Sequence, residues 1–443
     1  MSPPLDQVTS DAQLPTRADV VVVGGGVIGV SAAYFLARKG HSVALVEKGR
    51  IAGEQSSRNW GWCRQQNRDR RELPLMKHSM ELWGTLDREI GADMGFRRTG
   101  LVYVTKDPKE FATWAAWVEM AAEFQVRSRI LSPTQARAMT PGNKQEWIGG
   151  VHSAMDGRAE PAMAAPALAE AARKLGATVH QGCAVRGMEI TGGRISGVVT
   201  ERGRIEAGAV LCAGGAWASM FCRRHGIDLP QAGIRSTIFV TTPAAEVTTG
   251  GLVTPDFTIS RRLDGGYIVA AQNRGRLEVT PQGLRYARRF WPTFQTRRKS
   301  LTLGIGRSFF DGPEAIVGKW SFDSPSPFER NRVFAPPPDI RIVAPALRRI
   351  VATYPALQGI GMARIWGGWI DSMPDAVPVI SGVDALPGFF LATGFSGHGF
   401  GIGPGAGRLA ADLVAGDPPV VDPAPFRYAR LVDGTDLGRP GMM

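Results

Sequence analysis

The chain has 443 residues, of which 44% are hydrophobic and 21% are charged, a balance that is ordinary for globular proteins. It contains no repeat and no low-complexity tract, so repeat architectures and extended disorder are excluded. Its length suggests two or three domains.

Basic residues outnumber acidic ones, 52 to 40, which gives a net charge of +12. The basic residues are dispersed and no nucleic-acid-binding motif accompanies them, so we expect no nucleic acid partner. A solvated basic surface and peripheral attachment to an anionic membrane both remain open as explanations of the charge. The sequence leaves the oligomeric state open.

The four cysteines lie far apart without metal-ligand spacing, and the six histidines form no cluster. We therefore predict no metal site and no structural disulfide, as is typical of a reducing, cytoplasmic compartment. If the net charge reflects attachment to an anionic membrane, the protein would lie on the inner face of that membrane. The cysteines are Cys63, Cys183, Cys212 and Cys222, and the apolar neighbours of Cys183 and Cys212 indicate core positions.

From Val20 to Ala37 no residue is charged, so this run could be a membrane helix, a signal peptide, or a buried strand and helix. The preceding residues are polar and mixed in charge, and they lack the basic start of a signal peptide. Three glycines follow the β-branched run Val20–Val23, which is typical of a buried strand and a tight turn. We predict a strand over Val20–Val23, a helix over Val27–Lys39 and a strand over Ser42–Val46.

Gly24, Gly26 and Gly29 have the G-x-G-x-x-G spacing of a dinucleotide-binding turn, and Glu47 follows the second predicted strand. Such glycines let the chain turn, let the backbone approach a pyrophosphate, and let helix pack on strand. The helix N-terminus attracts the pyrophosphate, and Glu47 would accept hydrogen bonds from a ribose hydroxyl. The sequence therefore predicts a dinucleotide site near the N-terminal end of the chain.

Residues 49–71 form a long loop rich in Gly, Ser, Asn and Arg, of a kind that compact domains keep mainly for function. Helical patterns follow over Glu72–Ile90 and Phe111–Phe124, with a predicted strand over Phe96–Thr105 between them. A short capped helix then ends at Pro141.

A small-residue helix over Pro161–Leu175 opens a second unit of short strands. Residues 236–350 are predicted to be rich in sheet, with strand-like stretches STIFVTT, GGYIVAA and VGKWSF between polar loops. Residues 386–416 return to the pattern of strand, glycine-dense turn and helix. The short strands of the second unit are expected at Thr178–Gln181, Val185–Thr191, Ile195–Thr200 and Ala209–Cys212.

Three separated segments together resemble one family, the flavin-dependent amine oxidoreductases of the D-amino-acid oxidase type. That family includes D-amino-acid dehydrogenase, glycine oxidase, sarcosine oxidase and γ-glutamylputrescine oxidase. The resemblance spans about residues 18–420 and implies FAD rather than NAD as the cofactor. The segments are VVVVGGGVIGVSAAYFLARKGHSVALVEK, GAVLCAGGAWAS and GFFLATGFSGHGFGIGPGAGRLAADLV.

The fold that the resemblance implies is α/β: a glutathione-reductase-like FAD-binding domain and an α+β substrate domain with a large antiparallel sheet. On this basis the FAD-binding domain is expected over residues 18–95, 151–235 and 351–430. The substrate-binding domain is expected over 96–150 and 236–350, and loose termini over 1–17 and 431–443.

The resemblance also implies which residues contact FAD. The stretch from Ser56 to Asn59 would lie beside the pyrophosphate and the flavin ring, and the backbone of Val185 would meet the adenine. Closely spaced N–H groups of the second glycine turn can stabilise negative charge at the flavin N1 and C2 carbonyl edge. The expected set is Gly24, Gly26, Val27, Ile28, Gly29, Glu47, Lys48, Ser56, Ser57, Arg58, Asn59, Val185, Ala213, Gly214, Gly397, His398, Gly399 and Phe400.

Two positions depart from the family pattern. Ile370 stands where the amino-acid oxidases carry an arginine for the substrate carboxylate. Gly368 stands where sarcosine oxidases attach the flavin through a cysteine, so we expect non-covalent FAD. The stretch RIWGGWIDSMPDAVPVIS is more similar to the polyamine-type members, which have a Trp-Gly-Gly run there.

The resemblance implies an FAD-dependent amino-acid or amine oxidoreductase. Such an enzyme oxidises a C–N bond by hydride transfer to flavin N5 and gives an imine that hydrolyses. Oxygen or a separate electron acceptor would reoxidise the flavin, so oxidase and dehydrogenase stay undistinguished. Two alternatives remain: an FAD-dependent 2-hydroxy-acid dehydrogenase with His398 as its base, and a flavin subunit of a larger amine dehydrogenase complex.

Candidates for the substrate side are His398, Arg64, Trp366, Trp369 and Asp371. Arg64 and other arginines of the 58–71 loop could hold a carboxylate by paired hydrogen bonds in place of the missing arginine. The tryptophans could contact an alkyl body or a distal cation. Each of these side chains could equally be structural. The base that deprotonates an ammonium substrate stays open.

Overall fold

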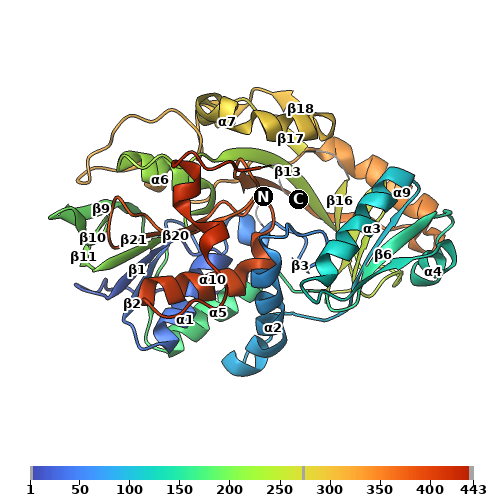
Figure 1. The fold of residues 1–443 in the computed structure, drawn as a ribbon, viewed down its shortest axis with the longest axis horizontal. Helices are drawn as coiled ribbons and strands as arrows, with labels where there is room; N and C mark the ends of the chain where they lie inside the picture. The colour runs from blue at the N-terminus through green and yellow to red at the C-terminus, as the bar shows by residue number, and fades with distance from the viewer. Residues whose placement is uncertain (1–2, 272–274, 439–443) are drawn as a thin grey trace.

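The described residues, 3–271 and 275–438 of the computed structural model, build two large sheets and two smaller ones (Figure 1). The first large sheet has six strands in the order β20-β21-β12-β1-β2-β8 and is parallel apart from β20. Its strands are β1 (Val20–Val23), β2 (Val43–Val46), β8 (Thr178–His180), β12 (Ala209–Cys212), β20 (Val379–Gly382) and β21 (Phe389–Thr393).

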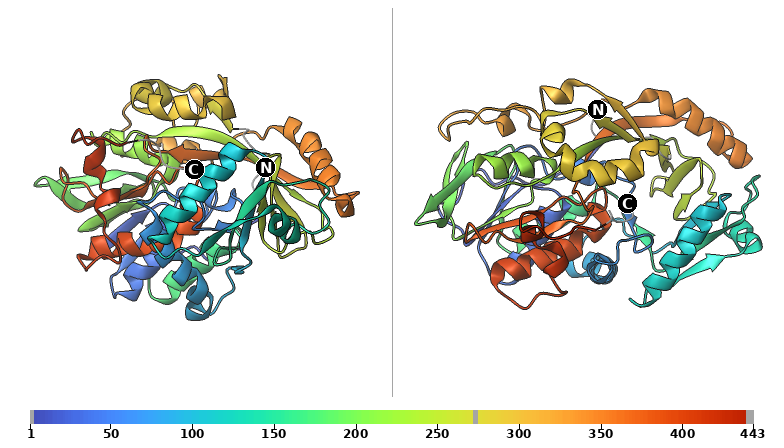
Figure 2. Two further views of the ribbon diagram at one scale, coloured as in Figure 1. Left: turned by 45° about the vertical axis from the view of Figure 1, so that its right-hand side comes forward. Right: turned by 45° about the horizontal axis from the view of Figure 1, so that its top comes forward.

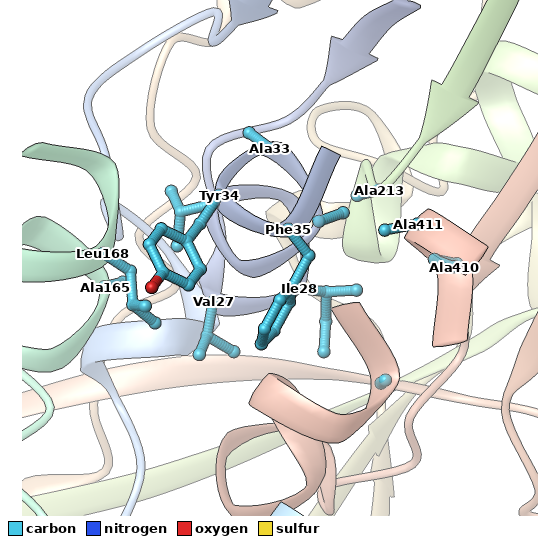
Figure 3. Close-up of a cluster of buried hydrophobic side chains, with 14 of the residues drawn as sticks. Val27, Ile28, Ala33, Tyr34, Phe35, Ala165, Leu168, Ala213, Ala410 and Ala411 are labelled. Atoms are coloured by element: carbon cyan, nitrogen blue, oxygen red, sulfur yellow. The ribbon is translucent and has the colours of Figure 1, made fainter. Parts of the chain in front are cut away.

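Helix α1 (Val27–Arg38) explains the uncharged run, because eleven of its twelve residues are buried. Figure 3 shows Val27, Tyr34 and Phe35 of α1 beside Leu168 of α5 and Ala410 of α10, within one buried apolar cluster. Burial of α1 among other helices of this protein therefore accounts for the uncharged run. The covering helices are α2 (Leu73–Ile90), α5 (Ala164–Lys174) and α10 (Gly399–Ala415).

Glycines let α10 approach α1 closely. A Cβ on Gly403 would lie 2.8 Å from Cγ2 of Val27, and a Cβ on Gly407 would lie 2.3 Å from Cβ of Ser31. Because these glycines are four residues apart, they share one face of the helix. The α10 glycines beyond the turn thus serve helix packing, which fixes the start of α10 relative to the start of α1.

The second large sheet has the order β18-β17-β13-β16-β15-β14-β4-β6-β5, and β19 (Met362–Ser372) pairs with β13 (Ala232–Thr241) along almost its whole length. Its apolar core includes Phe239 and Tyr267, and it is covered by α9 (Val343–Thr353). The other strands are β4 (Leu101–Thr105), β5 (Ser128–Leu131), β6 (Gly149–Ser153), β14 (Gly251–Val253), β15 (Phe257–Arg261), β16 (Tyr267–Ala271), β17 (Gly275–Glu278) and β18 (Leu301–Gly304).

The remaining elements connect the two large sheets. A three-stranded meander contains β9 (Val185–Thr191), β10 (Arg194–Thr200) and β11 (Gly203–Glu206), and β3 (Trp62–Cys63) pairs with β7 (Gly157–Arg158). Helix α3 (Pro108–Ala122) and the short helices α4 (Pro133–Met139), α6 (Ala218–Arg224) and α8 (Pro327–Arg330) complete the set. Helix α7 (Pro281–Arg297) stands at the top of Figure 1 and of the left view of Figure 2, far from α2 at the bottom.

Several predictions of local structure were wrong. The stretch VGKWSF, residues 317–322, belongs to no helix or strand, and only the last five residues of Phe96–Thr105 form β4. The region 236–350 holds α7 and α9 as well as strands. A proline at position 292 inside α7 makes that helix hard to predict.

The expectation of a loose segment before residue 18 does not hold for the part near Asp11. Its carboxylate accepts a hydrogen bond from the backbone N–H of Val179 at 2.7 Å and forms an ion pair with Arg173 at 2.9 Å. Residues 1–2 and 439–443, also expected to be loose, lie outside the described residues. The division into two domains stays a prediction, although β19, expected in the first, lies in the large antiparallel sheet.

Among the described residues, no helix combines the length and the apolar character that crossing a membrane would require.

Candidate functional site

A pocket with an empty volume of about 1260 Å³ runs along the carboxyl ends of the parallel strands. It reaches from the turn after β1 to the turn before α10, so two helix N-termini point toward it. Helix N-termini carry free N–H groups and partial positive charge, which favour phosphate and other anions. The pocket thus has the shape and polarity of a dinucleotide site.

The first glycine turn is so close to the neighbouring backbone that side chains would not fit. Gly24 has φ +109°, and a Cβ there would lie 2.5 Å from the carbonyl oxygen of Ala213. A Cβ on Gly29 would lie 1.9 Å from the carbonyl oxygen of Gly24. The hydroxyl of Ser56 accepts a hydrogen bond from the backbone N–H of Val27 at 2.9 Å and so caps the first turn of α1.

Glu47 lies where the dinucleotide fingerprint expects an acid, at the end of β2. Its two carboxylate oxygens accept hydrogen bonds from the backbone N–H groups of Gly25 and Gly49, each at 2.7 Å. Burial raises the pKa of Glu47, while the charge of Lys48 opposes that rise. The carboxylate lines the pocket and is held in one orientation, as a ribose acceptor would need to be.

An aromatic residue that the sequence did not single out lines the pocket, as Val185 does. Trp217 lines the pocket, and its indole N–H donates to the carboxylate of Glu54 at 3.1 Å. The ammonium of Lys48 lies 4.3 Å from the centre of the Trp217 ring and 2.6 Å from Glu54. These contacts form a flat, partly charged wall suited to an adenine ring.

The second glycine turn brings Gly397, Gly399 and Phe400 to the pocket wall. Gly397 has φ +86°, and a Cβ on it would lie 3.5 Å from Cγ2 of Ile370. Ile370 therefore lies beside the second glycine turn and presents only an alkyl surface there.

Most of the expected cofactor residues line the pocket, and four do not. Gly29, Ser57, Arg58 and His398 are absent from its wall. Ser57 donates its hydroxyl hydrogen to the carbonyl of Glu54 at 3.2 Å, and the Arg58 guanidinium donates to the carbonyl of Phe334 at 2.8 Å. The side chains of Ser57 and Arg58 thus hold the loop by hydrogen bonds to backbone carbonyls and do not line the pocket. Those at the wall are Gly24, Gly26, Val27, Ile28, Glu47, Lys48, Ser56, Asn59, Val185, Ala213, Gly214, Gly397, Gly399 and Phe400.

Arg64 lies in a buried cluster beside the second turn. Its guanidinium donates to the carbonyl of Gln66 and lies 6.0 Å from the centre of the Trp62 ring. Arg68, another arginine of this loop, is also buried and donates from Nε to the carbonyl of Arg64 at 3.2 Å. Burial and the neighbouring charge of Arg64 lower the pKa of Arg68 to about 9.

A buried acid and a buried imidazole meet in the same cluster. Nδ1 of His398 lies 3.2 Å from Oε2 of Glu72, and both side chains are almost fully buried. Burial raises the pKa of Glu72 to about 7. Burial, assisted by the charges of Arg68 and Arg64, lowers the pKa of His398 well below its usual value. Glu72 was missed because no local pattern distinguishes it from other helix-terminal acids.

The two candidate tryptophans lie on opposite faces of β19, because they are three positions apart in an extended strand whose side chains alternate. Trp366 packs with Ile238, Ile268 and Trp60. Trp369 packs edge-on against Phe334 with ring centres 5.5 Å apart and lines the cofactor pocket.

Asp371 also lines the pocket, where it holds the backbone in place. Its Oδ2 accepts hydrogen bonds from the N–H of Gly394 at 2.9 Å and from the amide of Gln231 at 3.3 Å. Burial raises the pKa of Asp371 to about 6. These bonds tie β19 to the end of β21, just before the second glycine turn.

The chain is similar in sequence and structure to known proteins. The family described as FAD dependent oxidoreductase matches residues 19–413. Mitochondrial sarcosine dehydrogenase of Homo sapiens is 25% identical over 415 residues, which are 91% of this chain and 40% of that protein. This chain therefore spans less than half the length of that relative.

Two further proteins match nearly end to end. Sarcosine oxidase subunit beta of Arthrobacter sp is 25% identical over 425 residues, covering 94% of this chain and 91% of the subunit. The solved structure of L-amino acid deaminase from Proteus myxofaciens in complex with anthranilate is 29% identical. It superposes with a TM-score of 0.92 and covers 97% of both chains.

Proposed function

The chain belongs to the family of FAD-dependent oxidoreductases, and from this premise we propose that it oxidises a C–N bond of an amino acid or amine to an imine that hydrolyses. The observation that carries the proposal is the pocket with a helix N-terminus at each end, flanked by a buried cluster of arginines, acid and imidazole. FAD, when bound, supplies the hydride acceptor. The chain's own residues bind and orient the substrate and handle its proton.

The residues present fit FAD. The glycine turn leaves room only for backbone beside a pyrophosphate, Glu47 stands at the ribose position, and Trp217 offers an aromatic wall. The N-terminus of α10, at Gly399, would stabilise negative charge on a flavin ring bound beside it. We infer non-covalent binding, because position 368 carries no thiol.

The substrate carries a carboxylate in this proposal, and the loop arginines replace the missing arginine at position 370. Arg64 and Arg68 are buried close together beside the second turn. Nη1 of Arg68 is buried and has no hydrogen-bond partner among the described residues. A buried guanidinium with an unused donor is well suited to receive a carboxylate.

The substrate's alkyl body is assigned to the face of β19 that carries Trp366. Gly368 and Ile370 share that face because they follow Trp366 at intervals of two residues. A Cβ on Gly368 would lie 2.7 Å from Oε1 of Gln55, a residue of the pocket wall. This face is therefore turned toward the site, and it is apolar, which favours long-chain, basic or opine-like secondary amines over glycine.

A second candidate function is that of a flavin subunit in a larger enzyme. The observation that favours it is the near-complete match to a protein named sarcosine oxidase subunit beta. An isolated subunit that binds FAD but is not bleached by any amine would support this candidate. Oxidation of a 2-hydroxy acid, with His398 taking the hydroxyl proton, is the remaining alternative.

The membrane is a further proposed partner. Residues 281–310 contain seven Lys and Arg and no Asp or Glu. The same stretch carries exposed apolar side chains on α7, β18 and the segment after it: Leu284, Trp291, Leu303, Ile305 and Phe310. Exposed apolar residues among basic ones match the surface of an anionic bilayer, so we infer peripheral binding from the cytoplasmic side.

The experiment that tests the function is anaerobic reduction of the purified, FAD-loaded protein by a panel of single compounds. The panel holds D- and L-amino acids, N-methyl amino acids, diamines, opine-like amines and 2-hydroxy acids. We expect bleaching of the flavin by a carboxylated amine. Bleaching by hydroxy acids alone would overturn the C–N assignment and favour the hydroxy-acid alternative.

A further inference from the structure

The pair of Glu72 and His398 joins two elements that are far apart in the sequence. Glu72 immediately precedes α2, and His398 immediately precedes α10. The two side chains are 0% and 3% exposed, and Oε2 of Glu72 lies 3.2 Å from Nδ1 of His398. At this distance and burial the two groups share a hydrogen bond whose proton belongs to one or the other.

The far atom of each group is buried without a partner. Nε2 of His398 and Oε1 of Glu72 make no hydrogen bond to any of the described residues. Since buried polar atoms are nearly always bonded in native proteins, Nε2 of His398 is free to bond a water or a ligand atom at this place. The neighbours of His398 on either side, Gly397 and Gly399, line the pocket.

The charges around the pair disfavour an imidazolium ion. The groups that act on His398 are Arg68, Arg64 and Arg297, which oppose its protonation, and Asp69, which favours it. The groups that act on Glu72 are Arg68, Arg64 and Arg71, which favour its ionised form, and Asp69, which opposes it. A proton that enters the pair is therefore held more easily on Glu72 than as a second proton on the ring.

We propose that Glu72 is a positioning residue that shares one proton with His398, so that Nε2 of His398 takes the proton from the ammonium group of the substrate. This inference rests on the proposed amine oxidation and deepens it. In the resting pair the Glu72 carboxylate accepts Nδ1–H, and Nε2 presents its lone pair.

The step balances without any change in oxidation state. The N–H bond of the ammonium breaks and an Nε2–H bond forms, while the Nδ1 proton moves to Oε2 of Glu72. The substrate becomes a neutral amine with a free lone pair. The pair becomes a carboxylic acid and a neutral imidazole, so no buried imidazolium is formed beside the arginines. A neutral amine is the form that can lose hydride, which makes this proton transfer a requirement of the reaction.

The first test reads the tautomer of His398 and needs no substrate. Ring nitrogens are observed by nitrogen-15 NMR in the FAD-loaded protein, and the His398 signals are identified by their loss in His398→Gln. Between about pH 5 and about pH 9 we expect the ring to change from Nε2–H to Nδ1–H as Glu72 ionises. In Glu72→Gln the change should be absent, and in the exposed helix neighbour Glu81→Gln it should persist.

The second test measures the rate of flavin reduction by an active amine as a function of pH. Glu72→Gln should lower the rate by about 10²-fold while the free amine is protonated, because general-base assistance is lost. The deficit should shrink at high pH, where the amine loses its proton in solution. A purely structural role would give the same deficit at every pH.

Either of two results would overturn the proposal: a His398 tautomer that is unchanged across the range in the unmodified protein, or a deficit that does not depend on pH. If Glu72→Gln does not fold, Glu72→Asp replaces it, and we expect the tautomer change to survive there. If no amine reduces the flavin, the proposed function fails, while the NMR test still decides whether the pair shares its proton.

Discussion

Trp366 and Trp369 lie on opposite faces of β19, although both were candidates for the same substrate wall. The Trp366 face carries Ile370 and is turned toward the second glycine turn. Trp369 lines the cofactor pocket and packs against Phe334. The two residues should therefore have separable effects on substrate and cofactor.

Trp366→Phe should raise KM for long-chain amines by roughly tenfold, since it removes part of an apolar wall, and should leave FAD content unchanged. Trp369→Phe should lower the FAD content of the purified protein and leave KM of the loaded fraction near its original value. Absorbance of the flavin and steady-state kinetics measure both effects. Equal effects of the two changes would show that the faces are not functionally distinct.

Arg64→Ala should raise KM for carboxylated substrates by one to two powers of ten, in line with about 1.5–3 kcal/mol for a hydrogen bond to a charged group. Amines without a carboxylate should be nearly unaffected. The matched control is Arg70→Ala on the same loop, whose exposed guanidinium forms an ion pair with Glu123. An Arg64 variant that loses activity equally toward both substrate classes would assign the residue to the fold instead.

The flavin should be released into the supernatant when the yellow protein is precipitated with acid or heat. No thiol is present at position 368, and Cys212, which lines the pocket, is a poor nucleophile because burial raises its pKa to about 12. The measurement is the absorbance of supernatant and pellet. Colour that stays with the denatured protein would contradict non-covalent binding.

The basic and apolar surface of residues 281–310 should bind anionic vesicles. We expect co-sedimentation with vesicles of phosphatidylglycerol and phosphatidylcholine, weakened by salt, and little with phosphatidylcholine alone. Trp291→Ser combined with Phe310→Ser should reduce binding, whereas Leu175→Ser, an exposed apolar position on the segment after α5, should not. Vesicle binding that is insensitive to the double change would place the contact elsewhere.

Glu314 should make stability depend on pH. Burial raises its pKa from 4.5 to about 7, and its carboxylate accepts a hydrogen bond from Thr280 at 2.6 Å. Between these two values the folded protein holds a proton that the unfolded chain releases, so this group's contribution to stability falls as pH rises through the interval. The full loss is about 3 kcal/mol.

The measurement is the thermal midpoint of the unmodified protein and of Glu314→Gln at a series of pH values. The side chain at position 314 of the variant cannot ionise. Its thermal midpoint should therefore rise relative to that of the unmodified protein as pH rises from 4.5 to about 7. For the control Glu123→Gln, at an exposed position, the difference in thermal midpoint from the unmodified protein should be the same at every pH. A constant difference between Glu314→Gln and the unmodified protein would show that Glu314 titrates normally.

The dinucleotide turn could be predicted from the sequence alone, and the structure agrees with the prediction closely. Strand β1 was predicted to the residue, and α1 ends one residue before the predicted Lys39. This was possible because the turn is local: glycine spacing, a β-branched run and a helix stop signal all lie within 23 residues of one another, between Val20 and Ser42. Membership of the flavin-dependent family, resting on three such local segments, was likewise readable and is confirmed.

Which polar side chains meet could not be predicted from the sequence, because it depends on the packing of distant segments. Glu72 and His398 lie 326 positions apart and are paired because α10 packs against α1 and α2, which no local pattern encodes. The opposite orientations of Trp366 and Trp369 follow from the register of β19 on β13, since a strand alternates its faces. Contacts of this kind depend on how distant segments bury their apolar faces together, and only the folded chain fixes that.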